Sequence, residues 1–582
     1  MKRRLLTVCC AALAALATLP AAAGAHAVVE QTQPTRGAAL ERPPQRVAVT
    51  FDEPVESSFG ALRVFAADGE RVDAGDVERP ADDAVAVAVE RDLPDGAYTV
   101  TYRVVSADSH PVTGGYVFTV GGAGGVPAAA VADLLGDSAG PVTEVAFGAV
   151  RAVSYAAIPL LAGGLIFLLA VWLPGLRGLA DAEAAAQAFE ARGIRLLALA
   201  ATAGMVATVL GIVLQVATAT GGSFWSALDS GLIHDVLDTR FGEVWKLRFT
   251  AFAGLAALLL LLPAVGSGAG QAARLASASG RAWLAALGLG CAYLVVSPAL
   301  GGHAGAGDDA GLLVPLNAAH VLAMSAWVGG VAALLLAVPA STRTLAPADR
   351  TRLLATLVRR FSTVALTAVA LLLASGIGQS ILELDALSDL VDTAFGRAIL
   401  VKVAIFAILI ALGAHNRRRS QPELARLAER GEEPGRTGVV LRRALRAEIG
   451  LMVVVLGVTA ALVSYSPSAG APAGPHSSSA DLGPARIELT VDPARAGSNE
   501  IHVYLFDARS GAQYDRARRL SIAARDRERD IGPIELDVRK AGPGHYTVAR
   551  ADLAPAGDWA LTVRAPVSDF EELRTELEVP IR

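Results

Sequence analysis

Residues 312–338 read LLVPLNAAHVLAMSAWVGGVAALLLAV and contain no Asp, Glu, Lys or Arg. An α-helix needs about 20 apolar residues to cross the hydrocarbon core of a bilayer, so this stretch predicts a transmembrane helix. Seven further segments have the same character. The expected spans are 147–174, 194–218, 244–265, 281–300, 312–338, 361–382, 397–414 and 447–466. The sequence therefore predicts an eight-helix transmembrane α-bundle over residues 144–466.

The charges between these segments predict the orientation of the bundle. The even-numbered connections, around residues 219–243, 301–311 and 383–396, are poor in Lys and Arg, whereas the odd-numbered ones are basic. Cytoplasmic loops carry the excess of Lys and Arg, so the odd-numbered connections are expected inside the cell. An even number of crossings then places both flanking domains outside the cytoplasm. We expect a multi-pass protein of the plasma (inner) membrane, with the lipid bilayer as a partner.

The membrane segment also contains an internal repeat. Residues 238–242 (DTRFG) precede the third span and residues 392–396 (DTAFG) precede the seventh. Residues 161–164 (LAGG) in the first span resemble 327–330 (WVGG) in the fifth. Two four-helix halves in the same orientation are a design that many transporters use.

The first 25 residues have the features of a secretory signal peptide. Three basic residues, Lys2 to Arg4, precede an apolar stretch, and Ala23-Gly24-Ala25 forms a small-residue cleavage site. Cleavage after Ala25 would make His26 the new N-terminus.

Two soluble domains flank the bundle. Residues 26–121 show short alternating strands separated by turn residues, which predicts an all-β sandwich or barrel. Residues 486–582 contain seven such strands and suit an immunoglobulin-like β-sandwich. Glycine-, alanine- and serine-rich segments at 122–143 and 467–485 are expected to be linkers.

The composition narrows the possible functions. Hydrophobic residues make up 53% of the 582, and the formal net charge is only −5, so nothing suggests a nucleic-acid partner. No nucleotide-binding motif is present. Of the three cysteines, two lie in the expected signal peptide and Cys291 lies alone in an apolar span, so no disulfide is expected in the mature chain.

The residues that could bind a metal are concentrated in the first soluble domain. His26, if exposed by cleavage, offers its α-amino nitrogen and a ring nitrogen. Asp108 and His110 are two residues apart and would share one face of a strand. Three nitrogens and one carboxylate oxygen favour a tetragonal Cu(II) site. The alternative is that Asp108 and His110 close a turn before Pro111.

The first domain resembles the copper-binding protein CopC. The residues that carry the resemblance are His26 after the signal, FDEPVE at 51–56 and SADSHPVTG at 106–114. The resemblance implies that His26, Asp108 and His110 bind Cu(II), with Glu53 as an acidic residue near the site. A methionine-rich Cu(I) loop is not expected.

The membrane segment resembles the CopD copper-resistance family over about 320 residues. The matching features are GHA at 302–304, His320 followed by WVGG at 327–330, FGR at 395–397, AHNR at 414–417 and RAE at 446–448. The whole chain thus resembles a CopC–CopD fusion.

Three residues could form a copper path in the membrane segment. His303 lies at the outer end of the fourth span, and His320 lies about eight residues, roughly 12 Å, into the fifth. Met324 is one turn further on the same face, and thioether and imidazole groups are both copper ligands. The alternative is that His320 bonds a neighbouring helix and Met324 fills space.

Several other polar residues of the chain do not predict a metal-binding site. Arg248 and Lys402 occupy corresponding places in the two halves and are expected to extend outward. Four further histidines lie in loops or strands without partners at ligand spacing. They are His234, His476, His502 and His545.

These observations favour a non-enzymatic protein that binds Cu(II) outside the cytoplasm and passes copper to its membrane domain for import. Two alternatives stay open: extracytoplasmic copper buffering or sensing without transport, and a membrane copper reductase. A reductase would need a redox cofactor such as haem, for which His303 and His320 are possible ligands. The oligomeric state and the direction of transport do not follow from the sequence.

Overall fold

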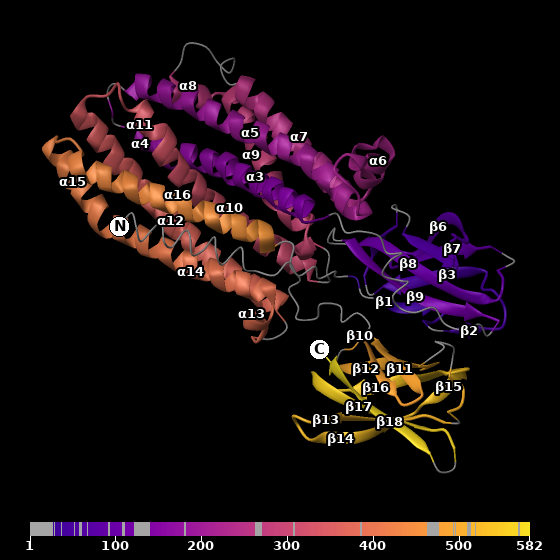
Figure 1. The fold of residues 1–582 in the computed structure, drawn as a ribbon. Helices are drawn as coiled ribbons and strands as arrows, with labels where there is room; N and C mark the ends of the chain where they lie inside the picture. Colours follow the sequence, from indigo (N-terminus) through magenta and orange to yellow (C-terminus); the bar gives the residue numbers. More distant parts are fainter. Residues whose placement is uncertain are drawn as a thin grey trace. The chain divides into compact units, whose positions relative to one another are not determined.

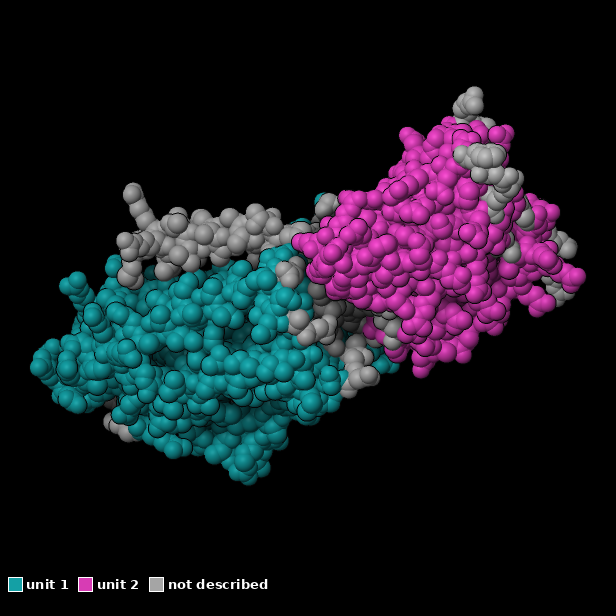
Figure 2. All heavy atoms as spheres, turned by 90° about the horizontal axis from the view of Figure 1, so that it is seen from below, with its two compact units in different colours: residues 1–23, 138–469 teal, residues 24–137, 470–582 magenta. Residues whose placement is uncertain are grey.

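The computed structural model (Figure 1) describes residues 27–121, 140–261, 270–462 and 476–581. The gaps within these ranges are 28, 37, 52, 58–60, 67, 91–92, 107–110, 178, 180–181, 306–308, 385–386, 493, 495, 509–513, 518 and 569–570. The chain divides into two compact units (Figure 2), one with residues 1–23 and 138–469 and the other with residues 24–137 and 470–582. The first contains the helices and the second contains the strands.

The described residues include eight helices that are long and apolar enough to cross a membrane, as predicted. Their bounds are Val142–Gly175, Ala182–Thr220, Arg240–Leu261 (α7), Ala278–Leu300 (α9), Ala310–Ser341, Pro347–Glu383 (α12), Ala394–Arg430 and Gly435–Leu462 (α16). Several run past the predicted apolar spans; α5 (Ala182–Thr220) starts twelve residues before the predicted 194. The reason is that backbone hydrogen bonding continues into the polar flanks of an apolar segment.

Some of these spans are composite. The first joins α3 (Gly140–Phe167), the π-helix η1 (Leu168–Trp172) and α4 (Leu173–Gly175). The fifth joins α10 (Ala310–Ala332), the π-helix η5 (Ala333–Ala337) and α11 (Val338–Ser341), and the seventh joins α14 (Ala394–His415), η6 (Asn416–Ser420) and α15 (Gln421–Arg430). Short elements between spans are η2 (Ser226–Leu228), α6 (Ser230–Asp238), α8 (Gln271–Ala276), η4 (His303–Gly305) and α13 (Asp389–Asp392).

The internal repeat predicted from the sequence appears as repeated local geometry. Thr239 and Thr393 cap α7 and α14, and their hydroxyl oxygens accept hydrogen bonds from the backbone N–H groups of Gly242 and Gly396 at 3.2 and 2.8 Å. A Cβ on Gly242 would lie 2.2 Å from a carbonyl oxygen of α6, and one on Gly396 would lie 2.1 Å from a carbonyl oxygen of α13. Each glycine is therefore required, because a short preceding helix packs directly against the start of the span.

The two other repeated motifs pack against each other. A Cβ on Gly163 of α3 would lie 2.8 Å from the Cα of Gly329 in α10, and one on Gly329 would lie 2.6 Å from the Cα of Gly163. Small residues at helix crossings in membranes allow such close backbone approach. The π-helices η1 and η5 follow this crossing in their respective halves, and each precedes a proline, Pro174 or Pro339. The crossing joins the two halves at their corresponding motifs.

The N-terminal β-domain is built from two sheets that enclose one apolar core. One sheet has the order β1 (Val29–Gln33), β3 (Arg46–Phe51), β7 (Ala84–Val89), β6 (Asp73–Ala81). The other has the order β2 (Ala39–Leu40), β9 (Pro111–Val120), β8 (Gly96–Ser106), β4 (Val55–Glu56), with β5 (Leu62–Ala66) also paired to β8. The all-β prediction for this domain is confirmed.

A buried ion pair stabilises this domain. The side chain of Asp73 is fully buried, accepts the backbone N–H of Val64 at 2.9 Å and lies 2.7 Å from Nη2 of Arg71. Burial by itself would raise the pKa of the Asp73 carboxyl, but the hydrogen bonds from Arg71, Val64 and Gly75 outweigh it and lower that pKa below 3.8.

The C-terminal domain is also a two-sheet β-structure around one core, as predicted. One sheet has the order β10 (His476–Leu482), β11 (Ala485–Asp492), β12 (Gly497–Asp507), β16 (His545–Leu553), β15 (Arg539–Gly542). The other has the order β14 (Ile531–Leu536), β13 (Ser521–Asp526), β17 (Gly557–Pro566), β18 (Glu572–Ile581). The strand β10 lies inside the segment 467–485 that composition predicted as a linker. Its serine-rich sequence has no strand pattern of its own; the strand exists because seven of its residues pair with β11.

Candidate metal sites

The strand register of the N-terminal β-domain shows which described residues lie at one end of the domain. The antiparallel pair β1–β3 aligns Val29 with Phe51, so the chain before Val29 runs past the end of β3 toward Glu53. Ala27, the first described residue, is only 2% exposed and belongs to the domain core. His26 is its neighbour in the chain and itself lies outside the described residues.

The connection between β8 and β9 returns to the same end of the domain. These strands pair antiparallel with Val105 opposite Pro111, and β4 pairs with β8 with Val55 opposite Ser106. The segment from Phe51 to Val55 leads from one sheet to the other at this end. Glu53, which is half-buried, lies in that segment, two residues before β4.

The described residues nearest to the predicted Cu(II) ligands, Ala27, Glu53 and the paired strand ends Ser106 and Pro111, thus lie toward one end of the two-sheet domain. Asp108 and His110 fall in 107–110, outside the described residues, so their atoms and those of His26 are not placed. The ligand set His26, Asp108 and His110, with Glu53 beside it, stays a prediction.

The membrane domain places His320 in a polar cluster between two helices. Its Nδ1 lies 3.1 Å from the hydroxyl oxygen of Ser375 on α12. One turn earlier on α10, Asn317 Nδ2 donates to Gln379 Oε1 at 3.1 Å, and Gln379 Nε2 donates to the Ser375 carbonyl oxygen at 3.2 Å. A Cβ on Gly376 would lie 3.5 Å from the His320 ring, which is ordinary van der Waals contact, so this position of α12 packs against the imidazole. Polar groups in this position are costly and are candidates for function.

The other two predicted path residues are less closely associated with this cluster. Met324 is one turn beyond His320 on α10 and packs, partly buried, against an apolar cluster that includes residues of both halves. His303 begins the 3₁₀ turn η4 just after α9. The structure thus connects His320 with Ser375, Asn317 and Gln379, three residues that sequence analysis did not select.

Arg248 differs from the prediction that it extends outward. It is 2% exposed, its Nε donates to Ser297 Oγ on α9 at 3.1 Å, and its guanidinium lies 4.9 Å from the ring centroid of Trp245. A hydrogen bond and an aromatic face between helices satisfy this cation, which the length of the side chain alone could not reveal.

The C-terminal domain holds a pair of histidines that sequence analysis set aside. His502 on β12 and His545 on β16 are 43 positions apart, but the register places Tyr504 opposite His545, so the two histidines are diagonal neighbours on one face. Nδ1 of His502 lies 3.2 Å from Nε2 of His545, and each residue is 6% exposed. Glu500 Oε1 lies 3.3 Å from the other ring nitrogen of His502. Only the strand pairing brings these groups together, so no local sequence signal could have found them.

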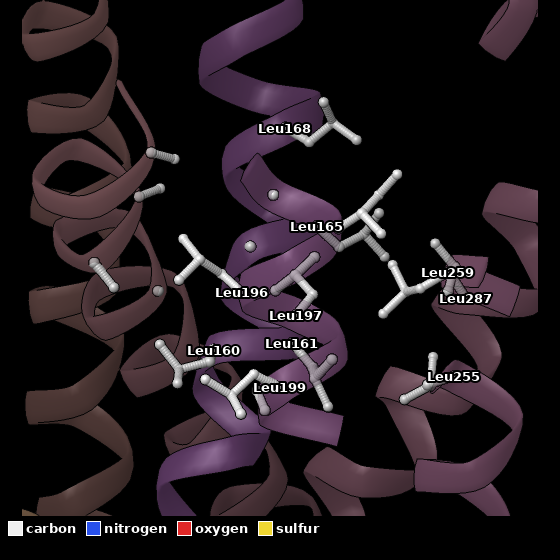
Figure 3. Close-up of a pocket in the computed structure, with 18 of the residues that line it drawn as sticks. Leu160, Leu161, Leu165, Leu168, Leu196, Leu197, Leu199, Leu255, Leu259 and Leu287 are labelled. Carbon is white, nitrogen blue, oxygen red and sulfur yellow. The ribbon is translucent and has the colours of Figure 1, made fainter. Parts of the chain in front are cut away.

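One cavity of the membrane domain has a different character. It has a volume of about 420 Å³ and lies among α3, α5, α7, α9 and α10, with leucine side chains pointing into it (Figure 3). Leu160, Leu197 and Leu255 are among its lining residues, and neither His320 nor Met324 lines it. Its lining is mostly apolar, but Glu190, Gln271 and Cys291 also line it. The polar cluster around His320 and Ser375 is a separate candidate for a metal path.

These features define a class: a multi-pass membrane protein whose helical segment is preceded and followed in the chain by a β-domain. Comparison with known families agrees. The CopC domain matches residues 29–121, the N-terminal domain of copper resistance protein D-like proteins matches 142–313, and copper resistance protein D matches 355–462. The chain belongs to the copper transport and resistance family in which a CopC domain is joined to CopD domains.

Three relatives illustrate the similarity. "Copper transport protein CutJ" of Bacillus subtilis is 28% identical over 96% of both chains. "Copper resistance protein D" of Pseudomonas syringae pv. tomato is 26% identical over 47% of this chain and 83% of its own length. "Copper resistance protein C" of Escherichia coli is 30% identical over 16% of this chain and 82% of its own length.

Proposed function

We propose that this protein captures Cu(II) outside the cytoplasm through its N-terminal β-domain and passes copper to its membrane domain for import across the plasma membrane. The observation that supports the proposal is that Ala27, Glu53 and the paired strand ends Ser106 and Pro111 lie toward one end of the N-terminal β-domain. His26, Asp108 and His110 adjoin these residues in the chain, and we propose that they meet at this end.

The chemistry of these groups suits Cu(II). An α-amine, two imidazoles and a carboxylate supply three nitrogens and one oxygen, the ligand set of tetragonal Cu(II). The amine must lose its proton to bind, so affinity should fall below about pH 8. Glu53 would add negative charge beside the ion.

The polar cluster in the membrane domain supports the second step. His320 offers a ring nitrogen whose opposite nitrogen is oriented by Ser375, and oriented imidazoles are effective metal ligands. Met324 lies one turn further along the same helix and offers a thioether. Together they would form a receiving site inside the bilayer, with His303 at its outer approach.

Copper accumulation in cells tests the proposal. Cells producing the wild-type chain are compared with cells producing His320→Gln, and His234→Gln is the control because the side chain of His234 is 76% exposed on α6. We expect His320→Gln to reduce cytoplasmic copper to the level of cells without the protein, while the tightest Cu(II) equivalent of the purified chain, which we assign to the N-terminal β-domain, is retained.

Other results would favour the alternatives. Accumulation that is indifferent to His320 but sensitive to His110→Ala would indicate extracytoplasmic buffering without transport. A haem absorption spectrum that is lost in His320→Gln would indicate a membrane reductase.

A further inference from the structure

The pair His502 and His545 is chemically unusual in the part of the chain that the structure describes. Two ionisable rings, each 6% exposed, face each other on the outer side of the sheet β10-β11-β12-β16-β15, away from the domain core. Tyr504 stacks on the His545 ring with centroids 4.3 Å apart. A structural role in packing would be served by apolar side chains, so the two imidazoles call for another explanation.

The distance between the facing nitrogens fits two ligands of one metal ion. Metal–imidazole bonds are about 2.0–2.1 Å long, and with 3.2 Å between Nδ1 of His502 and Nε2 of His545 they enclose an angle of about 100–105°. This angle lies between the square and the tetrahedral value. The separation of the two nitrogens is therefore that of neighbouring ligands in one coordination sphere.

Glu500 places a carboxylate beside the outer ring nitrogen of His502. Metal-bound histidines donate their other ring N–H to a carboxylate, a carbonyl or water, and this fixes the tautomer. Nε2 of His502 makes no hydrogen bond within the described residues, and Glu500 Oε1 lies 3.3 Å from it. A proton on Nε2 would face this carboxylate and leave Nδ1 free to bind the metal.

We propose that His502 and His545 form a second copper site in the C-terminal domain, with Glu500 orienting His502. Both ligands are neutral imidazoles, and Cu(II) has the highest affinity of the divalent first-row metals for such nitrogen sites. The proposal rests on the proposed function only for the identity of the metal. The C-terminal domain then holds copper independently of the N-terminal site.

The test is Cu(II) titration of the full-length protein in detergent, with bound copper counted and its electron paramagnetic resonance spectrum recorded. His545→Gln is made in the wild-type chain and in a His110→Ala chain, and His234→Gln is the matched control. We expect His545→Gln to remove one equivalent of Cu(II) and one nitrogen-coupled signal in both backgrounds, whereas His234→Gln removes none.

Glu500→Gln gives a second measurement that does not disturb the buried rings, because the Glu500 side chain is 34% exposed. Loss of a supporting carboxylate should weaken this site about 10–100-fold. Unchanged copper binding in both His545→Gln and Glu500→Gln would show an N–H···N hydrogen bond only and overturn the proposal. If His110→Ala has no effect but His545→Gln does, the N-terminal site is refuted and this one stands.

Discussion

Replacing Gly163 by Ala tests the crossing that joins the two halves of the membrane domain. The new Cβ would lie 1.8 Å from the carbonyl oxygen of Ser325 on α10, whereas ordinary contact begins at 3.4 Å. The separation must therefore grow by about 1.6 Å, and because the opposing atom is backbone, α3 and α10 have to move apart. Overpacking of this kind costs about 1–3 kcal/mol.

Gly148→Ala is the matched control. Gly148 lies on the same helix, but a Cβ there has nothing within 4 Å. The control should be neutral or stabilising by up to about 1 kcal/mol, because Ala favours a helix over Gly.

The buried thiol of Cys291 on α9 provides the assay. It belongs to the apolar cluster that also contains Leu161 and Ala162 of α3, next to the crossing. A fluorogenic maleimide should react with Cys291 only when this cluster opens on heating. We expect Gly163→Ala to lower the temperature of reaction by roughly 2–12 °C relative to Gly148→Ala. Equal temperatures for the two variants would refute the close crossing.

Three further predictions concern stability. Asp73→Asn should lower the free energy of unfolding at pH 7 and make it depend less on acidification. The reason is that a carboxyl with a lowered pKa stabilises the fold above about pH 4, and this contribution is lost as pH falls through the folded pKa. Urea unfolding of the full chain at pH 7 and about pH 3 measures both effects. Trp559→Ala should destabilise the C-terminal domain by about 3–5 kcal/mol, measured by its own unfolding transition, because this side chain is fully buried. Thr393→Val should lower the free energy of unfolding by about 1 kcal/mol, because the hydroxyl that caps α14 is lost. Thr239→Val should lower it by a similar amount at α7 if the two halves are equivalent. Thermal unfolding of each variant compares them.

The membrane domain was predictable because its signals are local. A run of apolar residues such as 312–338 determines a span by its own length, and the repeated DTxFG motif at 238–242 and 392–396 marks two equivalent caps. The contact between Gly163 and Gly329 was not predictable, because it depends on which helices of the bundle become neighbours.

The same distinction separates the candidate sites. His320 stood out because an imidazole in an apolar span is visible in the sequence, but its neighbours Ser375 and Gln379 come from another helix. Arg248 was misjudged because the length of its side chain allowed an outward position, whereas Ser297 on α9 offers it a buried one. His502 and His545 were missed because the pairing of β12 with β16 alone brings them together.

The measurement that tests the account most directly is Cu(II) titration of the purified full-length chain against two changes at the N-terminal site. One inserts a glycine between Ala25 and His26, which displaces the α-amine from the histidine, and the other is His110→Ala. The account predicts that each change alone weakens the tightest Cu(II) equivalent and alters its spectrum. Binding that is unaffected by both changes would contradict the site at the end of the N-terminal β-domain and, with it, the proposed capture of Cu(II) by this domain.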